Sequence, residues 1–402
     1  MYTSSIFKRI NYILLSLFFF VIAIDPSGTI LGIKEILFVF LFTSCLCNNM
    51  LTNKVQKDLI LIIGFALILP IYGILISLLR GNFADQEYAF GHLKSFLFIL
   101  ITFVLIQINI HKIFKIMFWG GTTLAILTCL IFIIYLLNEE LFSLVYSQTY
   151  DMGMVIISRR EYYGIPLQGV YMKAGPLIIF STIYSMYFYK ENILKYFFIA
   201  INLFALFVAG SRTPMLIAAL LLIIFFFDKK VFGKKSSYIF LIIMFCSLSM
   251  LILILASEKQ EHSVIDKSLN LYSYIDNIFH GSNSIFGAGL GSVFWANGKA
   301  KYISNSELTY LDLLRDYGII LGTLLIFVVY YPIIICLKSN IIRDIKYNRF
   351  IIGYLLYMIL AGTNPLLISS TGMFVWAVGL SIVNYIKKKE KYDKRLYCNL
   401  QR

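Results

Sequence analysis

The sequence predicts an all-α, polytopic integral membrane protein of about 12 transmembrane helices. The first observation is composition: 59% of the 402 residues are hydrophobic and only 14% are charged, whereas soluble proteins carry about 25% charged residues. The second is the length of the apolar runs, which recur from end to end and reach about 20 residues, enough to cross a hydrocarbon core of roughly 30 Å. Backbone polar groups in lipid must be paired within the segment, so these runs predict helices.

The predicted spans follow the apolar runs in order. The first, which carries Lys8 and Arg9, could be a signal peptide, but no small-residue cleavage site follows it, so we expect a retained helix. We expect residues 1–402 to form a single transmembrane domain. The predicted ranges are 7–24, 29–47, 59–80, 93–109, 113–137, 174–189, 194–209, 213–227, 237–256, 318–337, 350–366 and 371–386.

The basic residues predict the orientation. With both termini in the cytoplasm, the short inner loops and the C-terminal tail hold most of the lysines and arginines, including the stretches 229–235 and 387–402. This is the positive-inside pattern, and it indicates a multi-pass protein of a bacterial inner (cytoplasmic) membrane. The net charge of +14 therefore reports topology and does not indicate a nucleic-acid partner. The tail is expected beside anionic membrane lipid.

Function is expected on the periplasmic side, where the chain has two long loops, 138–173 and 257–317. The chain shows no phosphate-binding loop, and its 6 cysteines and 4 histidines show no metal-ligand spacing, so we expect neither a cofactor nor a metal. An apolar stripe in the second loop recurs at helical spacing and predicts amphipathic helices that pack on the bundle or lie on the membrane. The stripe consists of Ile265, Leu269, Tyr272, Ile275 and Phe279.

The first outer loop carries the motif SRREYYG at 158–164. Its adjacent Arg159 and Arg160 are planar cations suited to phosphate oxygens. Tyr163 and Tyr171 offer ring faces on which sugars stack, and Lys173 stands where the loop re-enters the membrane. The alternative is that these cations pair with a neighbouring carboxylate or with lipid headgroups.

The motif GSRTP at 210–214 predicts a tight outer turn between two apolar helices, with Gly210 ending one and Pro214 beginning the next. Arg212 is the only charged residue between Lys195 and Asp228. A charge at membrane depth indicates a functional site, and an anion at a helix N-terminus would also meet backbone donors. The alternative is an arginine that reaches the headgroup layer.

The third feature runs from FGAGLGS (286–292) to ELTYLDLLRDYGIILG (307–322). The glycines predict a tight loop and only weakly suggest nucleotide binding. An amphipathic helix is expected from Glu307 into the next span, with Glu307 and Arg315 on one face. A carboxylate at this boundary can act as a general base, although helix-surface ion pairs such as Asp312 with Arg315 are the alternative.

The GSRTP turn, the FGAGLGS loop and the ELTYLDLLRDYGIILG pattern resemble the O-antigen polymerase and O-antigen ligase superfamily of bacterial inner membranes, over nearly the whole chain. The resemblance places the turn arginine of that superfamily at Arg212 and puts Glu307 where ligases carry a motif histidine. A second loop arginine of the superfamily falls on Ser268, and the neighbouring Lys267 is expected to substitute for it. The re-entry motif, Gly-Ile-Ile-Leu-Gly, has one extra residue.

The resemblance implies a GT-C-like membrane glycosyltransferase that polymerises undecaprenyl-pyrophosphate-linked oligosaccharide on the periplasmic face. Arg212, with Arg159 or Arg160, would hold the pyrophosphate, and Glu307 would accept the proton of the acceptor hydroxyl. Substrate contacts are expected from the remaining candidates, and a polysaccharide chain-length regulator is the expected protein partner. An O-antigen ligase and a lipid-linked oligosaccharide flippase remain as alternatives. The substrate-binding candidates are Arg315, Lys267, Tyr163, Tyr171 and Lys173.

Overall fold

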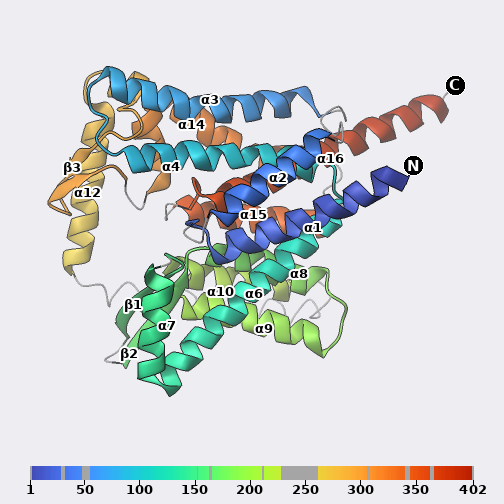
Figure 1. Cartoon of the computed structure of the whole chain (residues 1–402), viewed down its shortest axis with the longest axis horizontal. Coiled ribbons are helices and arrows are strands. Elements are labelled where there is room, and N and C mark those ends of the chain that lie inside the picture. The colour runs from blue at the N-terminus through green and yellow to red at the C-terminus, as the bar shows by residue number, and fades with distance from the viewer. Residues whose placement is uncertain are drawn as a thin grey trace. The chain divides into compact units, whose positions relative to one another are not determined.

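The computed structural model describes residues 2–28, 32–47, 55–151, 153–162, 165–210, 212–227, 261–305, 308–339, 345–362 and 366–400. The chain is mostly helical, at 79% (Figure 1). The helices are α1 (Tyr2–Ile24), α2 (Ile33–Cys47), α3 (Lys57–Leu79), α4 (Gln86–Leu97), η2 (Phe98–Ile101), α5 (Thr102–Leu105), α6 (Ile110–Leu137), α7 (Glu139–Asp151), η3 (Gly175–Leu177), α8 (Ile178–Tyr187), α9 (Ile193–Val208), α10 (Arg212–Phe227), α12 (Glu261–Phe279), α13 (Asn283–Phe286), α14 (Thr309–Lys338), α15 (Ile345–Gly362) and α16 (Ser370–Leu400). The strands are β1 (Val155–Tyr162), β2 (Ile165–Met172), β3 (Phe294–Ala296) and β4 (Lys301–Ile303).

Several described helices are long and apolar enough to cross a membrane, which is compatible with an all-α membrane protein. By length and composition, the candidate spans are Lys57–Leu79, Gln86–Leu105, Ile110–Leu137 and Thr309–Lys338. Shorter apolar helices are Arg9–Ile24, Ile193–Val208, Thr213–Phe225 and Asn348–Gly362. The predicted range 237–256 lies outside the described residues, and each of the other predicted ranges overlaps a helix.

The chain folds into two compact units, and the helices α1 and α6 each contribute residues to both units. The first unit comprises Met1–Phe19, Gly32–Ile113 and Ile265–Arg402. The second unit comprises Phe20–Leu31 and Phe114–Val264.

The core of the first unit is built around α16. Residues 370–384 of this helix are buried without interruption, as expected of a helix that is apolar on all sides. The ring of Phe374 lies 4.7 Å from that of Phe19, and Phe18 lies 5.7 Å from Phe98. Dispersion between these rings holds the helices that cover α16.

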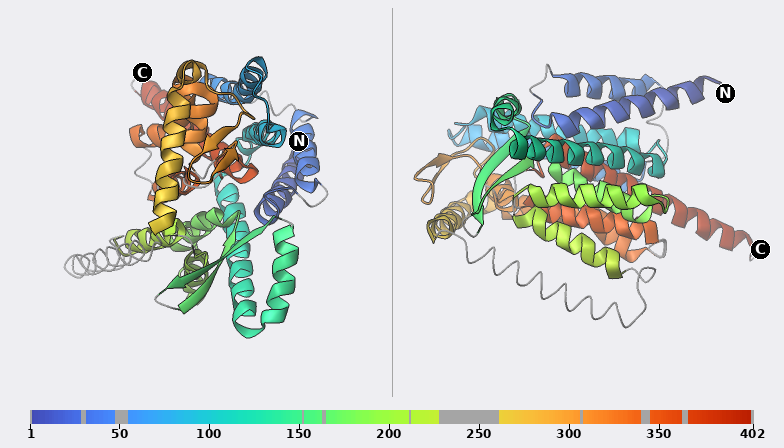
Figure 2. Two further views of the ribbon diagram at one scale, coloured as in Figure 1. Left: turned by 90° about the vertical axis from the view of Figure 1, so that its left-hand side faces the viewer. Right: turned by 90° about the horizontal axis from the view of Figure 1, so that it is seen from below.

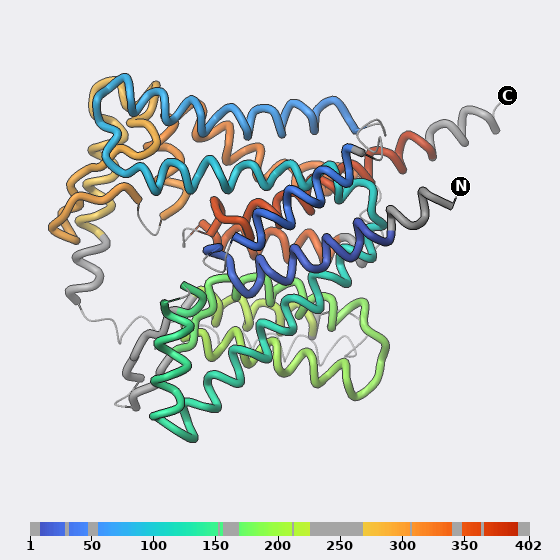
Figure 3. The backbone as a smooth tube through the Cα atoms, in the orientation of Figure 1, coloured from blue at the N-terminus to red at the C-terminus, as the bar shows by residue number. Residues whose placement is uncertain are grey.

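An antiparallel hairpin of α3 and α4 forms one side of the first unit (Figure 3). The connection is short, and Asp85 begins α4 by accepting a hydrogen bond from the Tyr88 amide at 2.9 Å. This is the N-cap arrangement, which satisfies an otherwise unpaired amide. At the other end of the hairpin, the Asp58 carboxylate accepts hydrogen bonds from Tyr331 and Lys387, which joins α3 to α14 and α16.

The helix that leads into the last long span is interrupted at Gly318, where φ is +81° and ψ is 165°. A Cβ at this glycine would lie 2.7 Å from the carbonyl carbon of Ile285, so only glycine fits. The interruption separates an amphipathic first segment, which begins at Thr309, from the apolar remainder of α14. The sequence predicted this division, because the span was expected to begin at residue 318.

The amphipathic helix α12 lies crosswise to α3 and α4 at one end of the first unit (Figures 1 and 2). The apolar stripe faces away from its contacts: Tyr272 is 69% exposed and Phe279 is 63% exposed. Packing is carried instead by Tyr274, at 0% exposure, and Ile278, at 3%. Of the two alternatives for the stripe, packing on the bundle is therefore wrong for Tyr272 and Phe279, because Tyr274 and Ile278 occupy the inward face of the helix.

The second unit departs from a purely helical plan. Residues 138–173, predicted as a loop, contain α7 followed by the antiparallel pair β1–β2, with Ser158 opposite Gly169 and Arg160 opposite Leu167. The β-branched run at 155–157 favours a strand. The hairpin was missed because both strands carry polar residues that resemble loop composition. The helices α8, α9 and α10 pack on one another in the same unit.

Candidate functional site

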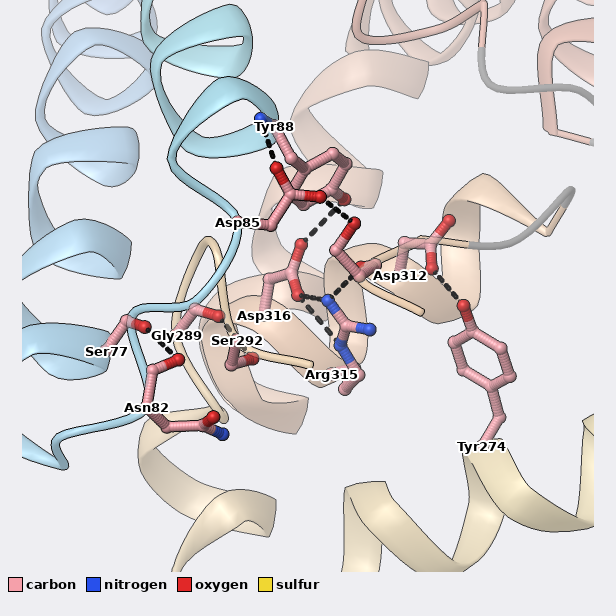
Figure 4. A network of polar contacts seen from close by, with 11 residues as sticks. Ser77, Asn82, Asp85, Tyr88, Tyr274, Gly289, Ser292, Asp312, Arg315 and Asp316 are labelled. Carbon is pink, nitrogen blue, oxygen red and sulfur yellow. Dashed lines mark hydrogen bonds and ion pairs between the residues drawn. The ribbon is translucent and has the colours of Figure 1, made fainter. Parts of the chain in front are cut away.

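The first unit contains a polar cluster at the start of α14, which we call the Arg315 network: Asp85, Tyr88, Ser304, Arg315 and Asp316. Figure 4 labels all of these residues except Ser304. Arg315 and Asp316 are both 0% exposed. The Arg315 Nε donates to Asp316 Oδ1 at 2.9 Å, and its Nη2 donates to the same carboxylate and to the Ser304 carbonyl. Tyr88 donates to Asp316 Oδ2 at 3.0 Å, and the Ser304 hydroxyl donates to Asp85. The network therefore joins α4, the segment before α14, and α14 itself.

The surroundings of the guanidinium leave one nitrogen unused. Arg315 Cζ lies 5.0 Å from the ring centroid of Phe294, a cation–π contact. Nearby, Tyr274 donates to Asp312 at 2.6 Å. Among the described residues, Arg315 Nη1 is buried and has no hydrogen-bond partner. The ion pair of Arg315 is with Asp316, the next residue, whereas the alternative interpretation of the sequence paired Arg315 with Asp312.

The glycine loop 287–291 clamps the start of α14 to α3. Gly287, Gly289 and Gly291 all have positive φ, which L side chains rarely adopt. The Ala288 amide donates to the Arg315 carbonyl at 2.7 Å, and the Leu290 amide donates to a carbonyl of α3 at 2.9 Å. A Cβ on Gly289 would lie 2.7 Å from Ser77 Cα. The loop amides are thus used within the protein, which gives these glycines a structural role in place of nucleotide binding.

The residues on either side of the predicted base are held by buried contacts. Glu307 itself lies outside the described residues. Before it, Ser304 belongs to the Arg315 network, and after it the Thr309 hydroxyl donates to the Ala361 carbonyl at 3.1 Å. Both residues are buried. The chain therefore enters and leaves the segment around position 307 from two anchored points.

In the second unit, the hairpin contacts the turn that carries Arg212. A Cβ on Gly169 would lie 2.7 Å from Gly210 Cα, and a Cβ on Gly210 would lie 2.5 Å from Gly169 Cα. The two glycines therefore meet backbone to backbone, and neither could carry a side chain. Since α10 begins at Arg212, the strand β2 abuts the N-terminal end of that helix.

The remaining predicted residues are spread over both units. Tyr171 of β2 is half-buried, and Lys173 follows β2, with its amide donating to the Met154 carbonyl at 3.0 Å. Tyr163 lies outside the described residues. The other candidates have described backbone positions in β1, α10 and α12, but their side chains lie outside the described part: Arg159, Arg160, Arg212 and Lys267.

The sequence analysis missed three members of the Arg315 network. Asp85 and Tyr88 come from a segment far along the chain from α14, and Ser304 lies just before α14 begins. Only the capping position of Asp85 before a helix could have drawn attention to it. His92, one turn along α4, was also missed; its ring centroid lies 4.1 Å from that of Tyr88. In the described part of the chain, no cluster of His, Cys, Asp and Glu side chains is arranged to hold a metal ion.

The geometry therefore offers a rigid polar centre in one unit and an arginine-bearing turn in the other. Comparisons with protein-family models, with curated proteins and with solved structures return no match to this chain.

Proposed function

We propose that this protein is a membrane glycosyltransferase that polymerises lipid-pyrophosphate-linked repeat units of a surface polysaccharide, on the periplasmic face of the bacterial inner membrane. The observation that carries the proposal is the contact of Gly169 with Gly210. This contact brings β2, and with it the paired strand β1 that contains Arg159 and Arg160, to the turn before Arg212. Two chain segments that carry arginines are thereby in backbone contact within one unit.

Arginine side chains suit the leaving group of this reaction, which is the lipid pyrophosphate. The acceptor hydroxyl of one repeat unit attacks the anomeric carbon of the growing glycan, and the bond from that carbon to the pyrophosphate oxygen breaks. The electron pair stays on the lipid pyrophosphate, whose charge rises in the transition state. Guanidinium groups and the amides that open α10 would stabilise that charge. The hydroxyl proton passes to a carboxylate, and the family resemblance alone proposes Glu307 for this role.

The strand register supports one of the two adjacent arginines over the other. Residues opposite each other in an antiparallel pair share a face, and positions alternate faces along a strand. Gly169, whose Cβ direction meets the turn, is opposite Ser158. Position 160 therefore shares the face that meets the turn, and position 159 is on the other face. We expect Arg160 to act with Arg212.

The test is complementation of a strain from which the gene is deleted, read on a lipopolysaccharide gel. Arg212→Ala and Arg160→Ala should each abolish the polymer ladder while the protein still inserts into the membrane at the wild-type level. Arg159→Ala is the matched control, because it removes the same charge one residue away, and it should keep the ladder. A full ladder from Arg212→Ala would refute the proposal, and equal loss from both strand variants would refute the assignment by register.

The deletion strain itself separates the alternatives. A core carrying a single repeat unit, without a ladder, supports the polymerase. Bare core with polymer accumulating on the carrier lipid would instead indicate a ligase, and bare core without periplasmic lipid-linked polymer would indicate a flippase. Glu307→Gln should remove the ladder as Arg212→Ala does, since it replaces the proposed proton acceptor by an amide.

A further inference from the structure

A cavity of about 280 Å³ lies in the first unit, at the end of α4–α5 that is remote from the Arg315 network. One wall is the connection from α5 to α6, and the other is the middle of α16, from Ser381 to Lys388. The candidate span Gln86–Leu105 ends where this connection begins, so the cavity lies at the level of lipid headgroups. Its polar lining consists of Asn109, His111, Ser381, Asn384, Tyr385 and Lys388.

Two buried polar side chains, Asn384 and Ser381, line the floor of the cavity. Asn384 is 2% exposed, and among the described residues its Oδ1 has no hydrogen-bond partner. Ser381 is 3% exposed and donates its hydroxyl proton to the Val378 carbonyl at 2.7 Å, which leaves its oxygen able to accept. Buried polar atoms are almost always paired. The floor is therefore suited to a ligand group that donates hydrogen bonds.

The rim of the cavity is electropositive. Lys388 and His111 are exposed at its edge, and none of the described residues that line it is acidic. The long helix α6 begins here, with Asn109 Oδ1 accepting from the His111 amide at 2.9 Å. The N-terminal end of a helix carries partial positive charge, so rim and helix together favour an anion.

We propose that this cavity binds the headgroup of an amine-bearing phospholipid, such as phosphatidylethanolamine. The ammonium group donates to Asn384 Oδ1 and Ser381 Oγ on the floor, and the phosphodiester pairs with Lys388 at the rim. A volume of about 280 Å³ lies at the lower limit for small-molecule sites, so it holds a headgroup and leaves the acyl chains in the membrane. This site is independent of the proposed polymerase reaction.

The test is native mass spectrometry of the full-length protein in detergent. Palmitoyl-oleoyl phosphatidylethanolamine or palmitoyl-oleoyl phosphatidylglycerol is added, and the bound lipid is measured. We expect the wild type to bind the ethanolamine lipid at least about 10-fold more tightly than the glycerol lipid. This is the ratio of affinities that a charge-assisted hydrogen bond supplies. Asn384→Leu should reduce that ratio to about one. Lys388→Gln should weaken both lipids, whereas the neighbouring Lys389→Gln, whose side chain does not line the cavity, should change neither.

Equal binding of the two lipids by the wild type would overturn the proposal, as would unchanged selectivity in Asn384→Leu. Ser381→Ala provides a second floor variant with a smaller change of shape if Asn384→Leu does not fold. Free phosphoethanolamine should displace the bound lipid. Failure to displace it would mean that the acyl chains, and not the headgroup, are recognised.

Discussion

Removing the buried cation of the Arg315 network should destabilise the protein strongly. Arg315→Met keeps an unbranched side chain of similar length but leaves the Asp316 carboxylate, at 0% exposure, without its ion-pair partner. It also removes the donor to the Ser304 carbonyl. Breaking a buried ion pair on one side costs about 3–5 kcal/mol. At roughly 2 °C per kcal/mol for a large domain, the melting temperature should fall by about 6–10 °C.

The assay heats the detergent-purified protein to a series of temperatures. Gel filtration then measures the fraction that remains monodisperse at each temperature. Asp316→Asn alone should also destabilise, because it leaves Arg315 charged and buried. The double variant, Arg315→Met with Asp316→Asn, should lose less stability than the sum of the two single losses. The difference should be at least about 1 kcal/mol, because the effects of contacting residues are usually not additive. A melting temperature within 2 °C of wild type for Arg315→Met would refute the reasoning.

The same variants decide whether Arg315 also binds substrate. A stable double variant that still supports the polymer ladder would mean that neither Arg315 nor Asp316 is needed for the proposed reaction. A stable double variant that makes no polymer would mean that the network is needed for it, and Arg315 Nη1, which has no partner among the described residues, is then the candidate for contact with substrate.

Two further variants test contacts that surround the Arg315 network: the glycine loop 287–291 and the hydrogen bond of Tyr274. Gly289→Ala should lower stability by more than about 3 kcal/mol, because its Cβ would lie 2.7 Å from Ser77 Cα at a φ of +90°. Its control is Gly281→Ala, which has a φ of +51° but open space around it, and which should cost only about 1–2 kcal/mol; equal melting temperatures would contradict the steric argument. Tyr274→Phe removes the hydrogen bond to Asp312 at 2.6 Å and should cost about 1.5–3 kcal/mol, whereas an unchanged melting temperature would mean that water replaces the phenol.

Part of the candidate site could be read from the residues alone. The GSRTP turn was identified because a glycine, an arginine and a proline between two apolar runs have few structural solutions, and the division of α14 near residue 318 followed from a change of periodicity. The other members of the Arg315 network could not be identified in this way. Asp85 and Ser304 are 219 residues apart, and no local pattern relates them.

The sequence by itself determined that this is a mostly helical chain with spans long enough for a membrane, since hydrophobicity and segment length are local properties that lipid converts directly into helices. Only the tertiary structure decided which face of α12 is exposed, that β1 and β2 form a hairpin, and that Gly169 meets Gly210. These outcomes depend on close packing between distant segments, where an approach of a few ångströms selects one register, and such an approach leaves no periodic signal in the sequence.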